Sequence, residues 1–195
     1  MNIDHLNKYQ IILASKSPRR SQLLSELGIK FTVDSKNGVD EVYPPGLSNN
    51  DIATYLSELK AKPYLEEVKE SNKLIITADT IVCTNNEVLG KPNTRTEAID
   101  MLQKLSGKKH QVITGVTLLS GSKRKSFSVV TDVFFKQLPE NEIIYYVDHY
   151  KPFDKAGAYG IQEWIGMTGI EKIEGSYFNV VGLPVQKLYT ELINF

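Results

Sequence analysis

The chain has 195 residues, with 23 Lys or Arg and 23 Asp or Glu, so its formal net charge is zero. This length suits one domain with a sizeable core, or two small lobes. A neutral chain has no long-range field that would attract nucleic acid or an anionic membrane, so any anion site must be local. The single cysteine, Cys83, excludes an internal disulfide and a cysteine-cluster zinc site, and it suits a reducing compartment.

The N-terminal residues lack the pattern of a secretory signal peptide, because Asp4, His5 and Lys8 precede only a short apolar run. No apolar run approaches the ~20 residues needed to cross a bilayer. We therefore expect a cytoplasmic protein that binds neither nucleic acid nor membrane.

The first predicted elements are a buried strand over 11–14 and the helix that follows it. Ser17 is a good N-cap, a proline comes next, and Gly28 is a typical C-terminal stop. Arg19 and Arg20 then fall in the first turn, where free N–H groups and the positive dipole end disfavour each cation by a few tenths to about 1 kcal/mol. A phosphate bound beside them would remove the conflict. The alternative is that both side chains simply bend away into water.

Helical and strand patterns alternate along the rest of the chain, which favours an α/β or α+β fold. No linker divides the sequence, so we expect one domain over 1–195. In chain order the patterns predict a strand over 31–33, a helix from about 48 to 60 ended by Pro63, a strand pair over 73–92 turning at Asn85-Asn86, a helix over 94–106, a long hairpin over 110–138 turning at Ser120-Gly121-Ser122, a helix over 139–149, an irregular loop over 151–166, a hairpin over 169–182, and a helix over 183–195.

Asp79 is the most unusual carboxylate, since it interrupts an apolar strand where an unpaired charge is costly. It needs a cation, a hydrogen-bond donor or a metal ion as partner, unless it turns to solvent at a strand end. Asp40 and Glu41 form a second acidic cluster, which could equally be an ordinary solvated pair. Lys60 and Lys91 are single lysines of the kind that usually face solvent, although the rigid Gly-Lys-Pro turn around Lys91 could aim it at a phosphate.

The remaining reactive residue types carry no motif. His5, His110 and His149 have no metal-ligand spacing, and Cys83 lies in an apolar strand, so we interpret all four as structural. The glycine-bearing stretches "LGK" and "DKAGAYG" match neither the Walker A loop nor the dinucleotide fingerprint.

Fragments spread over Ile12 to Phe195 resemble, in their order, the Maf family of septum-formation-protein-like nucleoside triphosphate pyrophosphatases. They read "LASKSPRRSQLLSELGIKF", "VDE", "LKAK", "ADTIV", "LGKP", "LSGKKHQVITGV", "TDVFF", "DKAGAYGIQ" and "GSYFNVVGLP". The Ser-Pro-Arg-Arg form of the first and the "DKAGAYGIQ" form of a later one are similar to the branch that acts on dTTP and UTP. The branch that prefers methylated guanosine nucleotides carries an aromatic residue before its arginine pair. One departure is Ser57, where the family usually has alanine.

The resemblance implies a fold akin to the inosine-triphosphate pyrophosphatases, with a mixed sheet in two lobes around a central nucleotide cleft, and commonly a homodimer. It also implies hydrolysis of dTTP and UTP to the monophosphate and pyrophosphate with a divalent metal cation, Mg²⁺ or Mn²⁺, so that non-standard or excess pyrimidine nucleotides are removed. The alternative from another class is a nucleotide-binding regulator of cell division or septation without significant turnover.

The same resemblance assigns roles to individual residues. Asp79 matches the proton acceptor and, together with Glu41, the metal-binding carboxylates, although whether Asp40 or Glu41 is the working residue stays open. Arg19, Thr80 and Gln162 match positions tied to substrate choice. The full set of expected substrate-binding residues is Ser15, Arg19, Arg20, Lys60, Thr80, Lys91 and Gln162.

Overall fold

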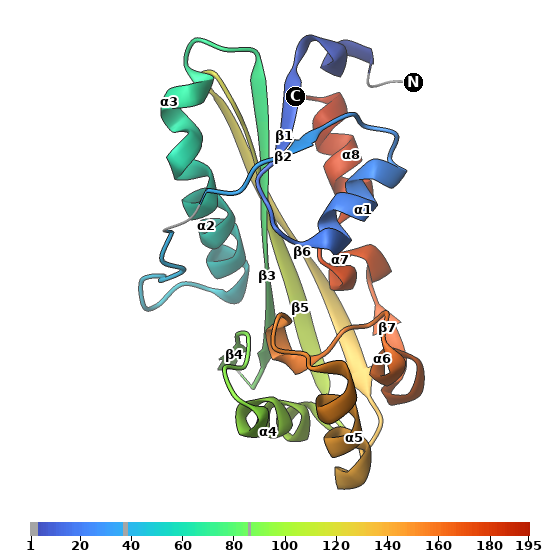
Figure 1. Cartoon of the computed structure of the whole chain (residues 1–195). Coiled ribbons are helices and arrows are strands. Elements are labelled where there is room, and N and C mark those ends of the chain that lie inside the picture. Colours follow the sequence, from blue (N-terminus) through green and yellow to red (C-terminus); the bar gives the residue numbers. More distant parts are fainter. Residues whose placement is uncertain (1–3, 37–38, 86) are drawn as a thin grey trace. The chain divides into compact units, whose positions relative to one another are not determined.

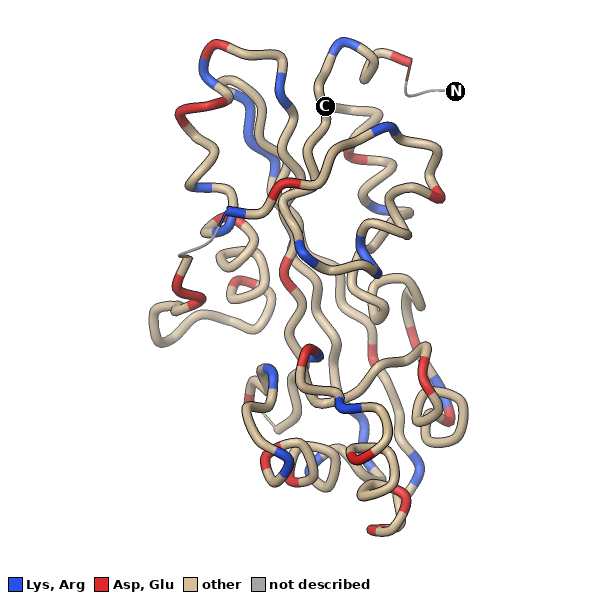
Figure 2. Tube along the Cα trace, in the orientation of Figure 1, with Lys and Arg blue, Asp and Glu red and all other residues tan. Residues whose placement is uncertain are grey.

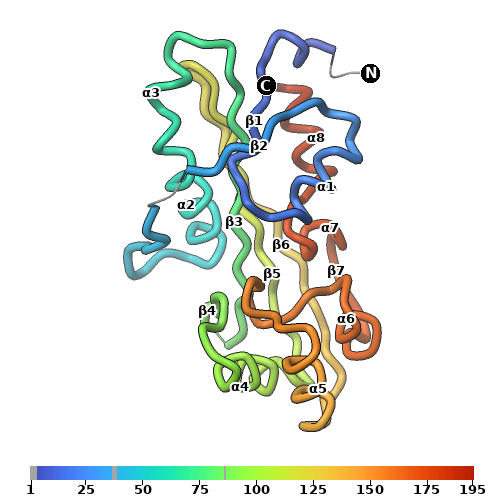
Figure 3. Tube along the Cα trace, viewed as in Figure 1, coloured from blue at the N-terminus to red at the C-terminus, as the bar shows by residue number. Residues whose placement is uncertain are grey.

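The computed structural model describes residues 4–36, 39–85 and 87–195. Within them the chain forms two compact units: the first holds 1–79, 114–129 and 182–195, and the second holds 80–113 and 130–181. The chain leaves the first unit after Asp79 and returns to it twice. Figure 3 shows its course, coloured by residue number. Whether the two units behave as the single domain expected from the sequence stays a prediction.

Seven strands of the described residues form a mixed sheet in the order β2-β1-β3-β5-β6-β7, with β4 paired to β3 (Figure 1). β1 runs parallel to β2 and β3, whereas β3 and β4, and also β6 and β7, run antiparallel. The strands are β1 (Gln10–Leu13), β2 (Thr32–Val33), β3 (Lys73–Thr84), β4 (Glu87–Leu89), β5 (Lys109–Ser120), β6 (Lys123–Phe135) and β7 (Ile170–Glu174). The mixed α/β class expected from the alternating patterns is confirmed.

The register between β1 and β3 brings two predicted site segments together. Ile12 pairs with Ile75, and Leu13 pairs with Ile76. One residue further on, the Ala14 N–H donates to the Ile76 carbonyl at 2.9 Å. Because the strands are parallel, the segment after β1 therefore enters the same region as the middle of β3.

The first unit packs its helices around buried aliphatic side chains. Its α-helices are α1 (Pro18–Glu26), α2 (Asn49–Ala61), α3 (Leu65–Val68) and α8 (Val185–Ile193), with 3₁₀ turns at Asp4–Lys8 and Lys62–Tyr64. One buried cluster joins strand and helix residues: Ile12, Ala14, Ala61, Tyr64, Val68, Ile75 and Leu119. This packing fixes the end of α2 against the sheet.

The second unit has a core of its own. Its helices are α4 (Arg95–Leu105), α5 (Glu140–Tyr150), α6 (Trp164–Gly169) and α7 (Tyr177–Val181), with a 3₁₀ turn at Ala156–Ala158. Leu102 and Leu105 of α4 share a buried cluster with Ile143 and Tyr146 of α5. Tyr159, from the loop predicted over 151–166, packs into the same cluster.

Most predicted elements are confirmed, but the hairpin over 169–182 is wrong. Its first half is β7, whereas Tyr177–Val181 forms α7. The aromatic and β-branched residues there favour a strand. The buried Asn179 overrides them, since its Nδ2 donates to the Val112 carbonyl and to Thr131 Oγ1, each at 3.0 Å. The segment 151–166, expected to be an irregular loop, also contains the start of α6. Asn86 of the expected Asn-Asn turn lies outside the described residues.

Acidic and basic residues are interspersed along both units (Figure 2). Within the described ranges, every helix is too short or too polar to span a bilayer.

Candidate functional site

Three charged side chains predicted from the sequence meet in the first unit. Lys60, in the last turn of α2, forms an ion pair with Asp79 on β3. Its Nζ also lies 3.0 Å from Glu41 Oε1. The side chain of Asp79 is 8% exposed and that of Glu41 is 47% exposed. One ammonium group therefore connects a buried carboxylate with a solvent-facing one.

The partner that Asp79 needs is thus supplied by a residue 19 positions earlier in the chain. Ala78 beside it and Ile81 two residues further along β3 are buried, so the carboxylate lies in a largely buried strand. A carboxylate in such a place is costly unless it is paired. The ion pair with Lys60 meets that requirement without turning Asp79 out to solvent.

Asp40 and Glu41 differ in their contacts. Glu41 is the member of the pair whose carboxylate contacts Lys60. Asp40 is exposed, and its backbone carbonyl accepts a hydrogen bond from the Val42 N–H at 2.8 Å. The geometry therefore favours Glu41 as the acidic residue of this cluster.

Glu41 and Asp79 are also the side chains here that could hold a divalent cation. Both contact the same Lys60 nitrogen, so their oxygens lie close enough to approach one cation. Across the described part of the chain, no three His, Cys, Asp or Glu side chains form a metal-binding group. Mg²⁺ commonly binds through one or two carboxylates and completes its shell with water and substrate phosphate. The residues present fit that kind of site rather than an all-protein cage.

Arg20 lies at the N-terminus of α1, as expected, and its guanidinium donates to two backbone carbonyls. Its Nε donates to the Gly182 carbonyl at 2.8 Å, and Nη1 donates to the Ala78 carbonyl at 2.9 Å. Burial lowers the pKa of Arg20 from its ordinary value, while the nearby carboxylates of Asp79 and Glu41 oppose that shift. Arg20 thus links the start of α1 to the β3 residue that precedes Asp79.

Ser15 and Arg19 complete the first-unit set. Ser15 is buried, and its Oγ accepts from the Ser17 N–H at 3.2 Å and lies 3.4 Å from Arg20 Nη1. The N-cap Ser17 makes no side-chain capping bond, so the first turn of α1 is not closed by its own cap. Arg19 is partly exposed beside it. The structure therefore brings together Ser15 with Arg20, and Lys60 with Glu41 and Asp79.

The other predicted residues, Thr80, Lys91 and Gln162, belong to the second unit. Thr80 is partly exposed on β3, and Lys91 and Gln162 are exposed. The Gly157 N–H donates to the Gly90 carbonyl at 3.0 Å, which ties the "DKAGAYGIQ" loop to the turn that carries Lys91. The two second-unit segments that hold predicted binding residues are thus joined through their backbones.

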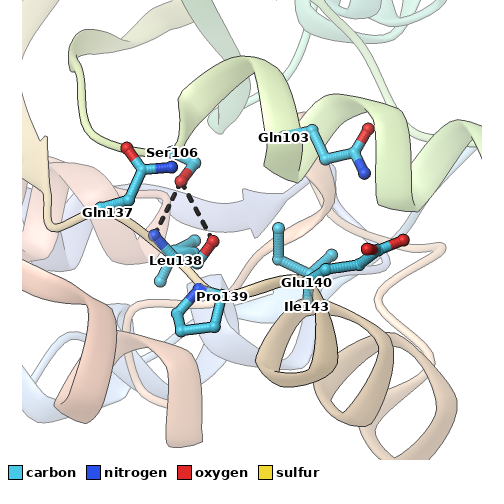
Figure 4. A pocket seen from close by; sticks show the side chains of 7 residues that line it. All are labelled: Gln103, Ser106, Gln137, Leu138, Pro139, Glu140 and Ile143. Carbon is cyan, nitrogen blue, oxygen red and sulfur yellow. Dashed lines mark hydrogen bonds between the residues drawn. The ribbon is translucent and has the colours of Figure 1, made fainter.

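None of these residues lines a hollow of about 400 Å³ between α4 and α5 (Figure 4). Ser106 Oγ on its wall accepts from the Leu138 N–H at 2.7 Å and lies 3.4 Å from the Leu138 carbonyl. The hydroxyl is therefore used in joining α4 to the segment before α5. We assign no ligand to this hollow.

Comparison with known proteins decides the family. The family model described as Maf-like protein matches residues 10–195. This chain belongs to the Maf family. A dTTP/UTP pyrophosphatase of Phocaeicola vulgatus is 55% identical to it over 97% of this chain and 98% of the relative. Proteins of the same name from Cytophaga hutchinsonii and Porphyromonas gingivalis are 54% and 46% identical, over 98% and 99% of this chain and 87% and 98% of the relatives.

A solved structure supports the fold of this Maf chain. The HAM1 protein from Coxiella burnetii superposes with a TM-score of 0.50, covering 96% of this chain and 100% of that one. The two sequences are only 16% identical, so the likeness concerns the fold alone. The expected kinship of folds is thereby confirmed.

Ser57, which departs from the usual Maf alanine, is fully buried on α2. Its Oγ lies 2.8 Å from Thr117 Oγ1 and donates to the Thr54 carbonyl at 2.7 Å. The extra hydroxyl is therefore accommodated by the neighbouring strand, and α2 still delivers Lys60 to Asp79.

Sequence reasoning missed the residues that shape the "DKAGAYGIQ" loop of this Maf chain. Gly157 and Ala158 both have positive φ, 66° and 58°, and Ala158 is fully buried. A Cβ at Gly157 would lie 2.9 Å from Val82. Glycine is therefore required there for two reasons, the positive φ and the lack of space for a side chain. The glycines were visible in the sequence, but the buried Tyr146 that contacts the end of this loop comes from α5 and carried no local signal.

Proposed function

We propose that this chain hydrolyses dTTP and UTP between the α- and β-phosphates, giving the nucleoside monophosphate and pyrophosphate. The observation that carries the proposal is a buried carboxylate, Asp79, paired with a lysine that also contacts Glu41. The names of the curated Maf relatives support the substrate pair. Removal of non-standard or excess pyrimidine nucleotides is the cellular task that fits this reaction.

Asp79 is the general base in this proposal. A carboxylate beside the α-phosphate can take the proton of an attacking water as the bond to phosphorus forms. Lys60 and Arg20 would counter the negative charge of the triphosphate, and a charge-assisted hydrogen bond of this kind contributes about 1.5–3 kcal/mol. The Lys60 ammonium contacts Asp79 and Glu41 in this structure. When the triphosphate binds, its oxygens would offer this ammonium additional hydrogen-bond acceptors.

Glu41 and Asp79 would hold a divalent cation, Mg²⁺ or Mn²⁺. When bound, the cation supplies charge neutralisation and Lewis-acid assistance at the phosphates. In the first unit, Ser15 and Arg20 stand at the N-terminus of α1, where backbone N–H groups suit an anion. We assign Arg19 to the triphosphate and to substrate choice.

We assign base recognition to the second unit. The amide of Gln162 can accept from N3–H and donate to O4 of uracil or thymine, and Thr80 is a second candidate for substrate choice. Lys91, on its Gly-Lys-Pro turn, is assigned to the phosphates. A site built for one hydrogen-bond pattern rejects the wrong base because its polar groups are then left unpaired.

The experiment is a substrate panel with purified protein and Mg²⁺. We expect dTTP and UTP to give equal amounts of monophosphate and pyrophosphate, faster than CTP, GTP or ATP. Release of inorganic phosphate in place of pyrophosphate would contradict the cleavage position. Nucleotide binding without turnover would favour the alternative of a regulator of division or septation.

Two further features belong to the proposal. We place the protein in the cytoplasm, where its substrates occur and where a lone buried thiol such as Cys83 stays reduced. We also propose a homodimer, to be tested by light scattering, in which a mass near twice the 22.0 kDa of one chain is expected.

A further inference from the structure

The turn that carries Gln162 is closed by its own backbone. It consists of Gly160, Ile161, Gln162 and Glu163, and the Glu163 N–H donates to the Gly160 carbonyl at 3.0 Å. Gln162 occupies the third position and is exposed, whereas Ile161 is buried. The side chain expected to read the base therefore stands on a tight turn rather than on a regular element.

One buried hydroxyl from another element contacts both ends of this turn. Tyr146 of α5 is 0% exposed, and its Oη accepts from the Gly160 N–H at 3.0 Å. The same Oη donates to the Glu163 carboxylate. A phenol has one O–H proton and can also accept through its oxygen lone pairs. The hydroxyl can therefore donate to Glu163 and accept from Gly160 at the same time.

The surroundings favour this protonated form. Burial raises the pKa of the Tyr146 hydroxyl above its ordinary value, and the neighbouring Glu163 carboxylate raises it further. Lys155, whose side chain is 10% exposed, lies 3.0 Å from the other carboxylate oxygen of Glu163. The carboxylate is thus held from two sides, by a neutral donor and by a cation.

The glycines in and beside the turn lie close to neighbouring atoms. A Cβ at Gly160 would lie 3.0 Å from both Glu163 Cδ and Lys155 Cε. A Cβ at Gly166 of α6 would lie 1.9 Å from the Ile161 carbonyl oxygen. Neither glycine has room for a side chain, and the Tyr146 hydroxyl bonds to both ends of the turn.

We propose that Tyr146 is a positioning residue for base selection, because its hydroxyl joins the two ends of the turn that presents Gln162. This inference rests on the proposed function, since it deepens the role assigned to Gln162. It assigns no contact between Tyr146 and the nucleotide.

The test is Tyr146→Phe, which keeps the ring and removes the hydroxyl. Loss of one or two hydrogen bonds to the turn should lower the ratio of kcat/KM for UTP to that for CTP by about tenfold. KM for UTP should rise more than kcat falls, since the chemical groups of the first unit are unchanged. Inhibition by pyrophosphate, which has no base, should keep its constant, whereas general damage to the site would weaken it.

The matched control is Tyr150→Phe, the same change on the same helix. Tyr150 is 37% exposed and stacks on Tyr146 at 5.1 Å between ring centroids. This variant should keep the wild-type ratio for UTP and CTP. An equal loss in both variants would overturn the proposal.

A double variant shows whether Tyr146 acts through Gln162. In a Gln162→Ala background, Tyr146→Phe should leave the UTP to CTP ratio unchanged, because the group it positions is gone. Additive losses would contradict the inference, and so would a Gln162→Ala variant that keeps the wild-type ratio. If Tyr146→Phe does not fold, Glu163→Gln alters the other end of the same contact and should lower the ratio in the same direction.

The outcomes separate the two proposals. An active wild type whose selectivity survives Tyr146→Phe overturns this inference alone. A wild type that does not turn over any pyrimidine triphosphate overturns the proposed function and the positioning role with it.

Discussion

At the scale of the residue, the central feature of the first unit is that Lys60 forms ion pairs with two carboxylates. Its ammonium contacts the buried Asp79 and the exposed Glu41. Truncating one partner of a buried pair removes its charge together with its hydrogen-bonding atoms, whereas replacing a carboxylate with its amide removes the charge but keeps the shape and an acceptor oxygen. Amide substitutions are therefore the cleanest probes of this cluster.

Asp79→Asn should abolish most turnover while nucleotide binding persists. The amide cannot accept a proton from water, and loss of a general base costs a factor of roughly 10²–10⁴. Pyrophosphate release measures the first effect, and calorimetric titration with UTP measures the second. Asp148→Asn is the matched control, since Asp148 forms an ion pair with Arg95 in the second unit and its side chain is 42% exposed. Near-normal turnover by the Asp79 variant would rule out its role as base.

Sequence reasoning predicted that Asp79 needs a partner, but not which one. The need follows from a charge within an apolar strand, which is local information. The identity of Lys60 depends on α2 packing against the sheet, and the ion pair to Glu41 depends on the path of a loop. Likewise, the first-turn position of Arg20 was predictable, whereas its bond to the Gly182 carbonyl, 162 residues away in sequence, was not.

His110, expected to be structural, should make the stability of the protein depend on pH. It is 1% exposed, its Nε2 lies 2.8 Å from Tyr159 Oη, and burial lowers its pKa to about 4, with Asp132 opposing part of the shift. A histidine in the unfolded chain titrates near pH 6.5, so between these values the unfolded state binds more protons. Stability should therefore fall by up to about 3 kcal/mol as the pH drops from 6.5 to 4.

Urea unfolding at several pH values between 4 and 7.5 measures this effect. His110→Phe should give a shallower dependence than the wild type in that window, because the titrating group is gone. Tyr159→Phe is the control, since it removes the hydrogen bond but keeps the histidine, and its pH dependence should persist. Parallel curves for wild type and His110→Phe would show that other groups carry the dependence.

At the scale of the element, a close approach of backbone fixes α2 against β5 in the first unit. A Cβ at Gly115 of β5 would lie 2.1 Å from the carbonyl oxygen of Ala53 on α2. Ala53 is fully buried, so the helix cannot yield without moving its neighbours. This contact matters to the site because the last turn of the same helix carries Lys60.

Gly115→Ala should destabilise the protein by about 2–3 kcal/mol, as expected for overpacking against backbone. It should also lower activity, since any displacement of α2 moves Lys60. Gly90→Ala is the matched control, because a Cβ there meets nothing within 4 Å, and its stability should change by less than about 0.5 kcal/mol. Chemical denaturation of both variants checks the difference. If the two variants had the same free energy of unfolding, α2 would be able to move away from β5 without destabilising the protein.

The elements themselves were predicted best where local signals agreed. Helix α4 begins after Thr94, whose side chain accepts from the Glu97 N–H, and both residues are visible as a cap in the sequence. Helix α7 was missed because the aromatic and β-branched residues around Asn179 favour a strand, whereas its buried hydrogen bonds are tertiary. The order of the strands could not be predicted from the sequence either, because it depends on which strands, far apart in the chain, pair with each other.

At the scale of the whole molecule, three strands connect the two units through the chain itself. β3, β5 and β6 each contribute residues to both, with the divisions after Asp79, before Thr114 and after Val129. They are also neighbours in the sheet order. Unfolding of one unit alone would have to stop partway along all three strands, leaving three interrupted strands. Such a boundary is costly, because exposed strand ends lose their paired hydrogen bonds.

We therefore predict that the protein unfolds in a single cooperative transition, in keeping with the one domain expected from its sequence. The chain has one tryptophan, Trp164, and it lies in the second unit, where its ring contacts Tyr145 at 5.2 Å between centroids. Its fluorescence reports on that unit, whereas far-ultraviolet circular dichroism reports on the whole chain. The two signals should give one midpoint, and the calorimetric enthalpy should equal the van't Hoff enthalpy. Gly115→Ala, in the first unit, then makes the sharpest test, since a cooperative chain must shift the Trp164 transition by as much as the circular dichroism transition. A tryptophan transition that stays at the wild-type midpoint while the circular dichroism curve splits would show that the units unfold separately.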